Sequence, residues 1–214
     1  MKVSPSPQPQ GAIAGRYAIR RRLGAGSLGT VYLVHDAVKG RAVALKLLRT
    51  DRLSAEAVRR FQGEFGALAS LEHPRLAAAY DFGYSGAGDL PYYTREYIEG
   101  RPLPAGPPGA AEPREFLRPI LDLLEALEHL HRHGILHLDV HPGNLIVAGE
   151  AARGSVLIDF GLFRSLDPIE SSLPARVLGP LPPEVARRGR ARPATDLFLA
   201  GRLLLYRLAG GECG

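Results

Sequence analysis

Hydrophobic and polar residues alternate along the first part of the chain, over residues 17–48. The runs YAIRRRL, TVYLVHD and RAVALKLL carry β-branched or aromatic residues, and the glycine-rich run GAGSLG separates the first two. Alternation of this kind is typical of strands with one buried face, and glycines between strands indicate turns. The pattern therefore predicts an antiparallel β-meander over this region. Two further strands are expected over residues 77–82 and 92–97.

The period changes from two to that of a helix in three stretches. The first covers residues 54–71 and places Phe61, Phe65, Leu68 and Leu71 on one stripe before His73-Pro74 ends it. The second covers residues 115–133, and its apolar positions are Leu117, Leu121, Leu124, Leu127 and Leu130. The third covers residues 196–209 and is mostly apolar.

These elements predict an α+β fold with two lobes. An antiparallel sheet with one main helix fills residues 16–99, and a mostly helical lobe fills residues 114–214. Residues 100–113 are so rich in Pro and Gly that they are predicted to be an irregular linker between the lobes. Residues 1–15 are rich in Pro, Ser and Gln, so a disordered leader is expected there.

Composition narrows the class of protein. The 214 residues are 45% hydrophobic and 23% charged, as in ordinary globular proteins, and no apolar run approaches the ~18 residues of a membrane span. Cys213 is the only cysteine, so no internal disulfide forms and a cytoplasmic location is expected. No membrane partner is predicted.

Clusters of arginine and of histidine could indicate binding of nucleic acid or zinc, but the surrounding residues do not support either. The net charge is +5, with arginines gathered at residues 20–22 and 186–192. Because no aromatic residues are interleaved, we interpret these clusters as solvated surface and predict no nucleic acid partner. His129 and His133 have a spacing that zinc ligands can use, but no further ligand accompanies them.

Two short motifs carry the candidate chemistry. They are HLDVHPGNLIV, at residues 137–147, and LIDFG, at residues 157–161. Phosphoryl transfer needs a group that aims the attacking hydroxyl and hard oxygen ligands for the metal on the phosphates. Asp139 suits the first task, while Asn144 and Asp159 suit the second. The runs LIV and VLI predict a hairpin that brings Asn144 and Asp159 to one end.

A purely structural interpretation of these residues stays open. Asp139 and Asn144 would then each close a turn, and Asp159 would begin a loop after a strand. The joint occurrence of the three residues, in this order, favours the chemical interpretation.

From residue 17 to its end the chain resembles a bacterial, eukaryotic-type serine/threonine protein kinase catalytic domain with its bilobal fold. The resemblance rests on GAGSLGTV, on VALK, and on the two motifs above. It implies ATP and Mg2+ as cofactors and a protein substrate. Lys46 would hold the nucleotide phosphates, and Glu64 would position Lys46, although a surface ion pair is the alternative. The phosphate loop would consist of Gly24, Ala25, Gly26, Ser27 and Gly29.

The resemblance also implies where the adenine ring binds. Backbone groups of the hinge residues Glu96, Tyr97 and Ile98 would bond the ring edge. The side chains expected to sandwich the ring are Val31, Ala44 and Ile146. Arg95 stands where the family usually has an apolar residue, so the back of this pocket is expected to be polar.

Three residues depart from the family pattern, and they affect the predicted regulation and the predicted substrate. Leu138 replaces an arginine that binds a phosphorylated activation loop, so such switching is not expected. His141 replaces a lysine near the γ-phosphate, and Val177 replaces a threonine that bonds this lysine. HPGN is similar to aminoglycoside and choline phosphotransferases, so a small-molecule substrate is one alternative. A nucleotide-binding pseudokinase is another, and a protein kinase in which His141 partly replaces the lysine is preferred.

The resemblance further implies helices beyond residue 214. We therefore expect the chain to be part of a longer polypeptide, with some apolar helix surface open to water. Glu184 is expected to lack its usual arginine partner.

Overall fold

The computed structural model describes most of the chain, which forms two compact units. The first unit comprises Met1–Leu53 and Ala79–Tyr97, and the second comprises Ser54–Ala78 and Ile98–Gly214. The described residues are 11–26, 29–50, 54–86, 90–106, 113–149, 153–159, 182–186 and 191–211. Within them, no helix is both long and apolar enough to cross a membrane.

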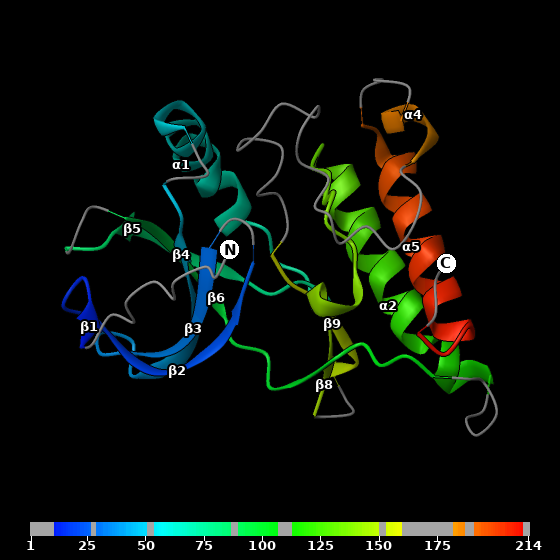
Figure 1. Cartoon of the computed structure of the whole chain (residues 1–214), viewed down its shortest axis with the longest axis horizontal. Helices are drawn as coiled ribbons and strands as arrows, with labels where there is room; N and C mark the ends of the chain where they lie inside the picture. The colour runs from blue at the N-terminus through cyan, green and yellow to red at the C-terminus, as the bar shows by residue number, and fades with distance from the viewer. Residues whose placement is uncertain are drawn as a thin grey trace, which may run out of the picture. The chain divides into compact units, whose positions relative to one another are not determined.

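The first unit is a six-stranded antiparallel sheet with the strand order β1-β2-β3-β4-β6-β5 (Figure 1). The predicted meander and the two later strands are therefore confirmed. The strands are β1 (Ala12–Ile13), β2 (Tyr17–Ala25), β3 (Gly29–Asp36), β4 (Arg41–Leu48), β5 (Ala79–Tyr84) and β6 (Pro91–Glu96).

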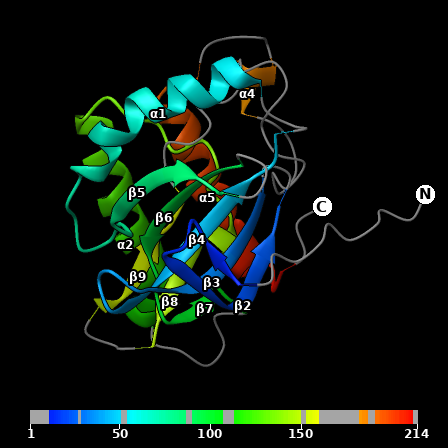
Figure 2. The ribbon, with the colours of Figure 1, turned by 90° about the vertical axis from the view of Figure 1, so that its left-hand side faces the viewer.

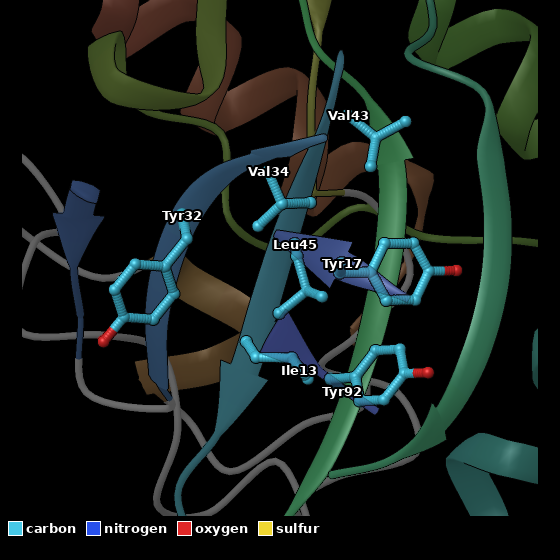
Figure 3. Close-up of a cluster of buried hydrophobic side chains, with 7 residues drawn as sticks. All are labelled: Ile13, Tyr17, Tyr32, Val34, Val43, Leu45 and Tyr92. Carbon is cyan, nitrogen blue, oxygen red and sulfur yellow. The ribbon is translucent and has the colours of Figure 1, made fainter. Parts of the chain in front are cut away.

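One face of this sheet carries the core of the unit (Figure 3). Its buried side chains are Ile13, Tyr17, Tyr32, Val34, Val43, Leu45 and Tyr92. The rings of Tyr17 and Tyr92 meet edge to face, with centroids 5.5 Å apart. Alternate residues of β3 and β4 enter this core, which explains the period of two in the sequence.

The prediction of a disordered leader over residues 1–15 is wrong at its C-terminal end. Residues 1–10 lie outside the described part, but β1 pairs with β2 through Ile13 and Tyr17. Ile13 is only 4% exposed because it packs into the sheet core. Ala14 and Gly15 turn the chain with positive φ angles. A strand of two residues is too short to show alternation, so the sequence pattern did not reveal it.

The second unit combines helices with a small antiparallel sheet. Its strands lie in the order β7-β8-β9 (Figure 2). Helix α2 packs against α5 and β9. The elements are α1 (Ala55–Ala69), β7 (Gly100–Pro102), α2 (Pro113–Arg132), a 3-10 helix (Pro142–Asn144), β8 (Leu145–Ala148), β9 (Ser155–Leu157), α4 (Pro183–Ala186) and α5 (Pro193–Leu208).

Helix α1 has the predicted stripe. Phe61, Phe65 and Leu68 are buried, and so is Leu71, two residues past the end of the helix. The Ser54 hydroxyl caps the helix by accepting a hydrogen bond from the Ala57 amide at 3.1 Å. The helix falls in the second unit, whereas the predicted boundaries placed it in the sheet lobe.

Helix α2 exists as predicted, but its buried face differs from the apolar positions that marked it in the sequence. Leu117, Leu121 and Leu124 are 37–49% exposed, while Leu127 and Leu130 are fully buried. The helix is apolar around more than half of its circumference, so its sequence does not specify which stripe meets the rest of the unit. The buried stripe consists of Phe116, Ile120, Leu123, Leu127 and Leu130.

The predicted linker over residues 100–113 is not irregular throughout. Gly100 begins β7, which pairs with β8 through Gly100 and Ala148. A Cβ atom at Gly100 would collide with the Val147 carbonyl oxygen, so a glycine permits this close pairing. Residues 107–112 lie outside the described part.

Candidate active site

The predicted hairpin is present and brings two candidate metal ligands to one end of it. Strands β8 and β9 pair through Leu145 and Leu157, and the Ile158 amide donates to the Asn144 carbonyl at 2.9 Å. Asn144 immediately precedes β8, and Asp159 follows β9 by two residues. Both side chains are buried, at 6% and 8% exposure, and Asp159 has a positive φ of 60°.

The amide group of Asn144 holds the predicted catalytic carboxylate. Its Nδ2 donates to the Asp139 carbonyl at 2.9 Å and to Asp139 Oδ2 at 2.8 Å. Both N-H groups of Asn144 are thus directed at Asp139, and its Oδ1 oxygen remains for another partner. A buried amide oxygen beside a buried carboxylate fits the hard oxygen ligands that Mg2+ requires.

The two oxygens of Asp139 differ in their surroundings. Asn144 Nδ2 bonds Oδ2, and His141 Nε2 lies 3.6 Å from the same oxygen. No donor contacts Oδ1 among the residues that the structure describes. The Asp139 side chain is 12% exposed, so Oδ1 is the oxygen available to an incoming hydroxyl.

His141 begins the 3-10 helix that leads to Asn144. It is the N-cap residue, and its Nδ1 accepts a hydrogen bond from the Gly143 amide at 3.0 Å. A ring nitrogen that accepts a hydrogen bond carries no proton, so the proton of a neutral ring is on Nε2. Gly143 leaves room for the ring, because a Cβ there would lie 2.8 Å from His141 Cε1.

Asp196, at the start of α5, anchors the loop that carries Asp139. Its carboxylate is fully buried and accepts hydrogen bonds from the His137 amide at 2.9 Å and the Leu138 amide at 2.8 Å. His131 Nε2 is a further partner of this carboxylate, at 2.8 Å. Leu138 has a positive φ of 61°, which is strained for a residue with a branched side chain. The bond to Asp196 holds Leu138 in this conformation.

His137 supports the same loop from inside, and sequence reasoning missed it. Its Nδ1 accepts from the Asp139 amide at 3.1 Å, and its Nε2 lies 3.1 Å from the Ile158 carbonyl, to which it donates. Complete burial lowers the pKa of His137, which favours this neutral donor-and-acceptor form. The sequence signal that could have identified His137 is its place as the first residue of the HLDVHPGN motif. His131 was also missed, because only its contact with Asp196 distinguishes it from other helix residues.

In the first unit, the described part of the predicted phosphate loop forms the tip of the β2–β3 hairpin. Gly24 pairs with Val31, Ala25 pairs with Thr30, and the Gly26 amide donates to the Gly29 carbonyl at 2.8 Å. A Cβ on Gly29 would collide with the Leu47 carbonyl oxygen of β4, so this position requires glycine. Ser27 lies outside the described residues.

The register of the sheet places the other predicted nucleotide contacts of this unit on one face. Val31 pairs with Lys46, and Lys46 pairs with Tyr93 on the next strand. Ala44 lies two residues from Lys46 and therefore on the same face, opposite the core of Figure 3. The Lys46 ammonium lies 5.9 Å from the centre of the Tyr93 ring.

The expected hinge begins where β6 ends, and Arg95 takes part in it. Arg95 is only 8% exposed, and its Nη1 donates to the Glu96 carbonyl at 3.0 Å. The Tyr97 hydroxyl accepts from Arg21 at 3.0 Å. Arg95 thus places a buried cation beside the predicted hinge, and the polar pocket expected there stays a prediction.

Several predicted site residues belong to different units. Lys46 lies in the first unit and Glu64 in the second, so their pairing remains a prediction. The same holds for Ala44 and Ile146 as two sides of an adenine site. Within the second unit, Ile146 packs against the buried cluster that contains Ile98.

The histidines that have the spacing of zinc ligands lie in a row of neighbouring rings. His129 lies between His73 and His133, with ring centroids 4.8 Å and 4.6 Å away. His133 Nδ1 lies 2.8 Å from the His129 carbonyl, to which it donates. Across the described residues, no group of three or more His, Cys, Asp or Glu has the arrangement of a metal site.

Glu184, expected to lack an arginine partner, is bonded by a hydroxyl group. The Thr195 hydroxyl donates to its carboxylate, and this bond holds the pKa of Glu184 below its usual value. Val177 lies outside the described residues, so its predicted place near His141 is untested.

Comparisons with known proteins bear on the family and the fold. The family model described as the protein kinase domain matches residues 17–213. The chain is 34% identical over 205 residues to the serine/threonine-protein kinase PrkC of Bacillus subtilis, covering 92% of this chain and 31% of PrkC. It is also 34% identical over 208 residues to PknA of Mycobacterium tuberculosis, covering 92% of this chain and 47% of PknA. The chain thus spans less than half the length of either relative.

A solved structure shares the fold. The crystal structure of the Mycobacterium tuberculosis PknI kinase domain superposes with a TM-score of 0.72 at 26% sequence identity. The match covers 96% of this chain and 78% of the PknI chain.

Proposed function

Because this chain belongs to the protein kinase family, we propose that it transfers the γ-phosphoryl group of ATP to serine or threonine hydroxyls of a protein. The observation that carries the proposal is the carboxylate of Asp139. Asn144 holds one of its oxygens, and the other has no donor among the described residues. The serine/threonine kinase names of the relatives support the choice of hydroxyl.

In the proposed reaction, Asp139 Oδ1 accepts a hydrogen bond from the substrate hydroxyl and aims its oxygen at the γ-phosphorus. A bond forms between that oxygen and phosphorus, and the bond from phosphorus to the β,γ-bridging oxygen breaks. The electron pair of the broken bond leaves with ADP, and the hydroxyl proton passes to Asp139. Proton acceptance of this kind contributes about 10²- to 10⁴-fold, and positioning with charge stabilisation supplies most of the remainder.

The oxygens available at one end of the β8–β9 hairpin fit a magnesium ion. Asn144 Oδ1 and the carboxylate of Asp159 would hold the ion, because the Asn144 amide nitrogen is already committed to Asp139. Bound magnesium would neutralise charge on the phosphates.

We further propose that the first unit binds the nucleotide. Val31, Ala44 and Lys46 share the sheet face opposite the core, which supports contacts with the adenine ring and phosphates. The described glycines at the β2–β3 tip would let backbone N-H groups approach the phosphates. Glu64 would position Lys46, and the hinge backbone would bond adenine. A reducing cytoplasm is the proposed compartment, since the chain has a single cysteine.

A small-molecule phosphotransferase is the second candidate. The observation that favours it is His141, because the HPGN motif that begins with this residue resembles that of aminoglycoside and choline phosphotransferases. The same Asp139, Asn144 and Asp159 would serve in either reaction, so only the acceptor distinguishes the two proposals.

ADP release by the purified chain, with magnesium and ATP, tests the proposal directly. A panel of protein substrates and a panel of hydroxylated metabolites are compared in parallel. We expect release with proteins, and loss of that release in Asp139→Asn with ATP binding retained in a thermal-shift assay. Glu128→Gln is the matched control, because it removes an exposed carboxylate on α2.

Each possible result has a definite meaning. Release only with metabolites would replace the protein kinase proposal with the second candidate. ATP binding without turnover on either panel would instead indicate a pseudokinase. Turnover that survives in Asp139→Asn would show that the role of Asp139 is wrong.

A further inference from the structure

We propose that His141 is a positioning residue, which acts through Asp139 as a neutral imidazole with its proton on Nε2. Its Nε2-H group faces Asp139 Oδ2 and would bond it when the substrate hydroxyl binds at Oδ1. This inference rests on the proposed phosphoryl transfer and concerns the orientation of the carboxylate.

The tautomer follows from the hydrogen bond on the other side of the ring. The Gly143 amide donates to His141 Nδ1 at 3.0 Å, and an amide can donate only to an unprotonated nitrogen. The ring lies close to Gly143, where a Cβ would leave only 2.8 Å to Cε1. The local turn therefore selects the Nε2-H form before any substrate arrives.

The position of Nε2 directs this proton at the carboxylate. Nε2 lies 3.6 Å from Asp139 Oδ2, and the two side chains are only 13% and 12% exposed. This distance exceeds a hydrogen bond, but a shift of roughly 0.5 Å would create one. Catalytic hydrogen bonds often shorten in this way when substrate binds.

His141 and Asn144 act on the same oxygen of Asp139. Asn144 Nδ2 bonds Oδ2 at 2.8 Å, and the described residues provide no donor to Oδ1. Once the Nε2 contact shortens, two donors on Oδ2 would restrict rotation of the carboxylate and leave Oδ1 as the acceptor for the substrate hydroxyl. A lysine at this position would have no lone pair for the Gly143 amide, so it would not be held in the same way.

Two substitutions distinguish the role of His141 Nδ1 from that of His141 Nε2. In His141→Asn the side-chain oxygen takes the place of Nδ1 and still accepts from Gly143, but the Nε2-H group is lost. In His141→Gln the amide N-H reaches toward Asp139, whereas the cap on Gly143 is weakened. If His141 only caps the turn, His141→Asn should have normal turnover. If His141 positions Asp139, His141→Asn should have reduced turnover.

We expect His141→Asn to lower kcat about 10- to 100-fold with KM for ATP unchanged, as for one lost hydrogen bond to a charged group. His141→Gln is expected to retain kcat within about threefold and to melt at a lower temperature. The matched controls are His133→Asn and His133→Gln at an exposed position one residue after α2, which should leave kcat unchanged. Wild-type kcat in His141→Asn, or an equal loss of kcat in both His141 variants, would overturn the inference.

A spectroscopic measurement is independent of turnover. The ¹⁵N resonances of labelled histidine distinguish protonated from unprotonated ring nitrogens, and we expect His141 to have a protonated Nε2 and a bare Nδ1. A protonated Nδ1 would refute the tautomer even if the enzyme is active. Absence of turnover in the wild-type chain would instead refute the proposed function, and with it the role of His141 in catalysis.

Discussion

Replacing Asp196 tests whether one buried carboxylate holds the catalytic loop. In Asp196→Ala, the His137 and Leu138 amides lose the partner that they bond at 2.9 Å and 2.8 Å. Asp196 is fully buried, so water does not replace these bonds without local opening. Leu138 also loses the bond that stabilises its positive φ of 61°.

The magnitude follows from the number of bonds lost. A hydrogen bond to a charged group contributes about 1.5–3 kcal/mol, so two backbone bonds amount to about 3–6 kcal/mol. A typical domain has a net stability of about 5–15 kcal/mol, so Asp196→Ala should be severely destabilised. Asp196→Asn keeps one acceptor oxygen and turns an NH₂ group toward the other amide, so we expect about half of this loss.

Urea denaturation followed by circular dichroism measures the free energy of unfolding, and amide hydrogen exchange reports on the loop itself. Glu128→Gln is the control, because its exposed ion pair with Arg132 should be worth less than about 1 kcal/mol. We expect faster exchange of the His137 and Leu138 amides and lower phosphoryl transfer in Asp196→Asn. Wild-type stability, with unchanged protection of both amides, would refute the anchoring role.

Three further predictions concern backbone space and pH. Gly29→Ala should lower the melting temperature and reduce the free energy of unfolding by about 1–3 kcal/mol, because the new Cβ would meet the neighbouring strand. Its control is Gly63→Ala, in an open helical position, which should be neutral or stabilising. Gly154→Ala should also destabilise the chain, since Gly154 has a φ of 67° and its Cβ would meet Asp122; an unchanged urea midpoint would contradict this. The pKa of His137 lies below its ordinary value of 6.5, so the unfolded chain binds more protons and stability should fall as pH decreases below 6.5. Urea titrations at several pH values check this, and constant stability through that window would count against it.

The sequence predicted elements well where one face of an element is distinctly apolar. In α1 the stripe from Phe61 to Leu68 is buried as expected, because the opposite face is polar. In α2 the apolar residues cover a wider arc, and Leu117 and Leu121 proved exposed while Leu123 is buried. The choice between such faces depends on which neighbours pack against the helix, and the helical period carries no information about them.

The sequence by itself determined the family resemblance and the three polar residues of the candidate site. Asp139, Asn144 and Asp159 follow from motif spacing, and the short hairpin that unites two of them follows from local apolar runs. Such features depend on residues close together in the chain, which is why a sequence can specify them.

Only the tertiary structure decided how individual atoms are used. It bonds Asp196 to the His137 and Leu138 amides, across 59 and 58 residues of sequence, and directs Asn144 Nδ2 at Asp139. The bonds to Asp196 depend on the packing of α5 against α2. The physical reason is that a hydrogen bond requires a donor and an acceptor at a defined distance and angle, and packing sets both.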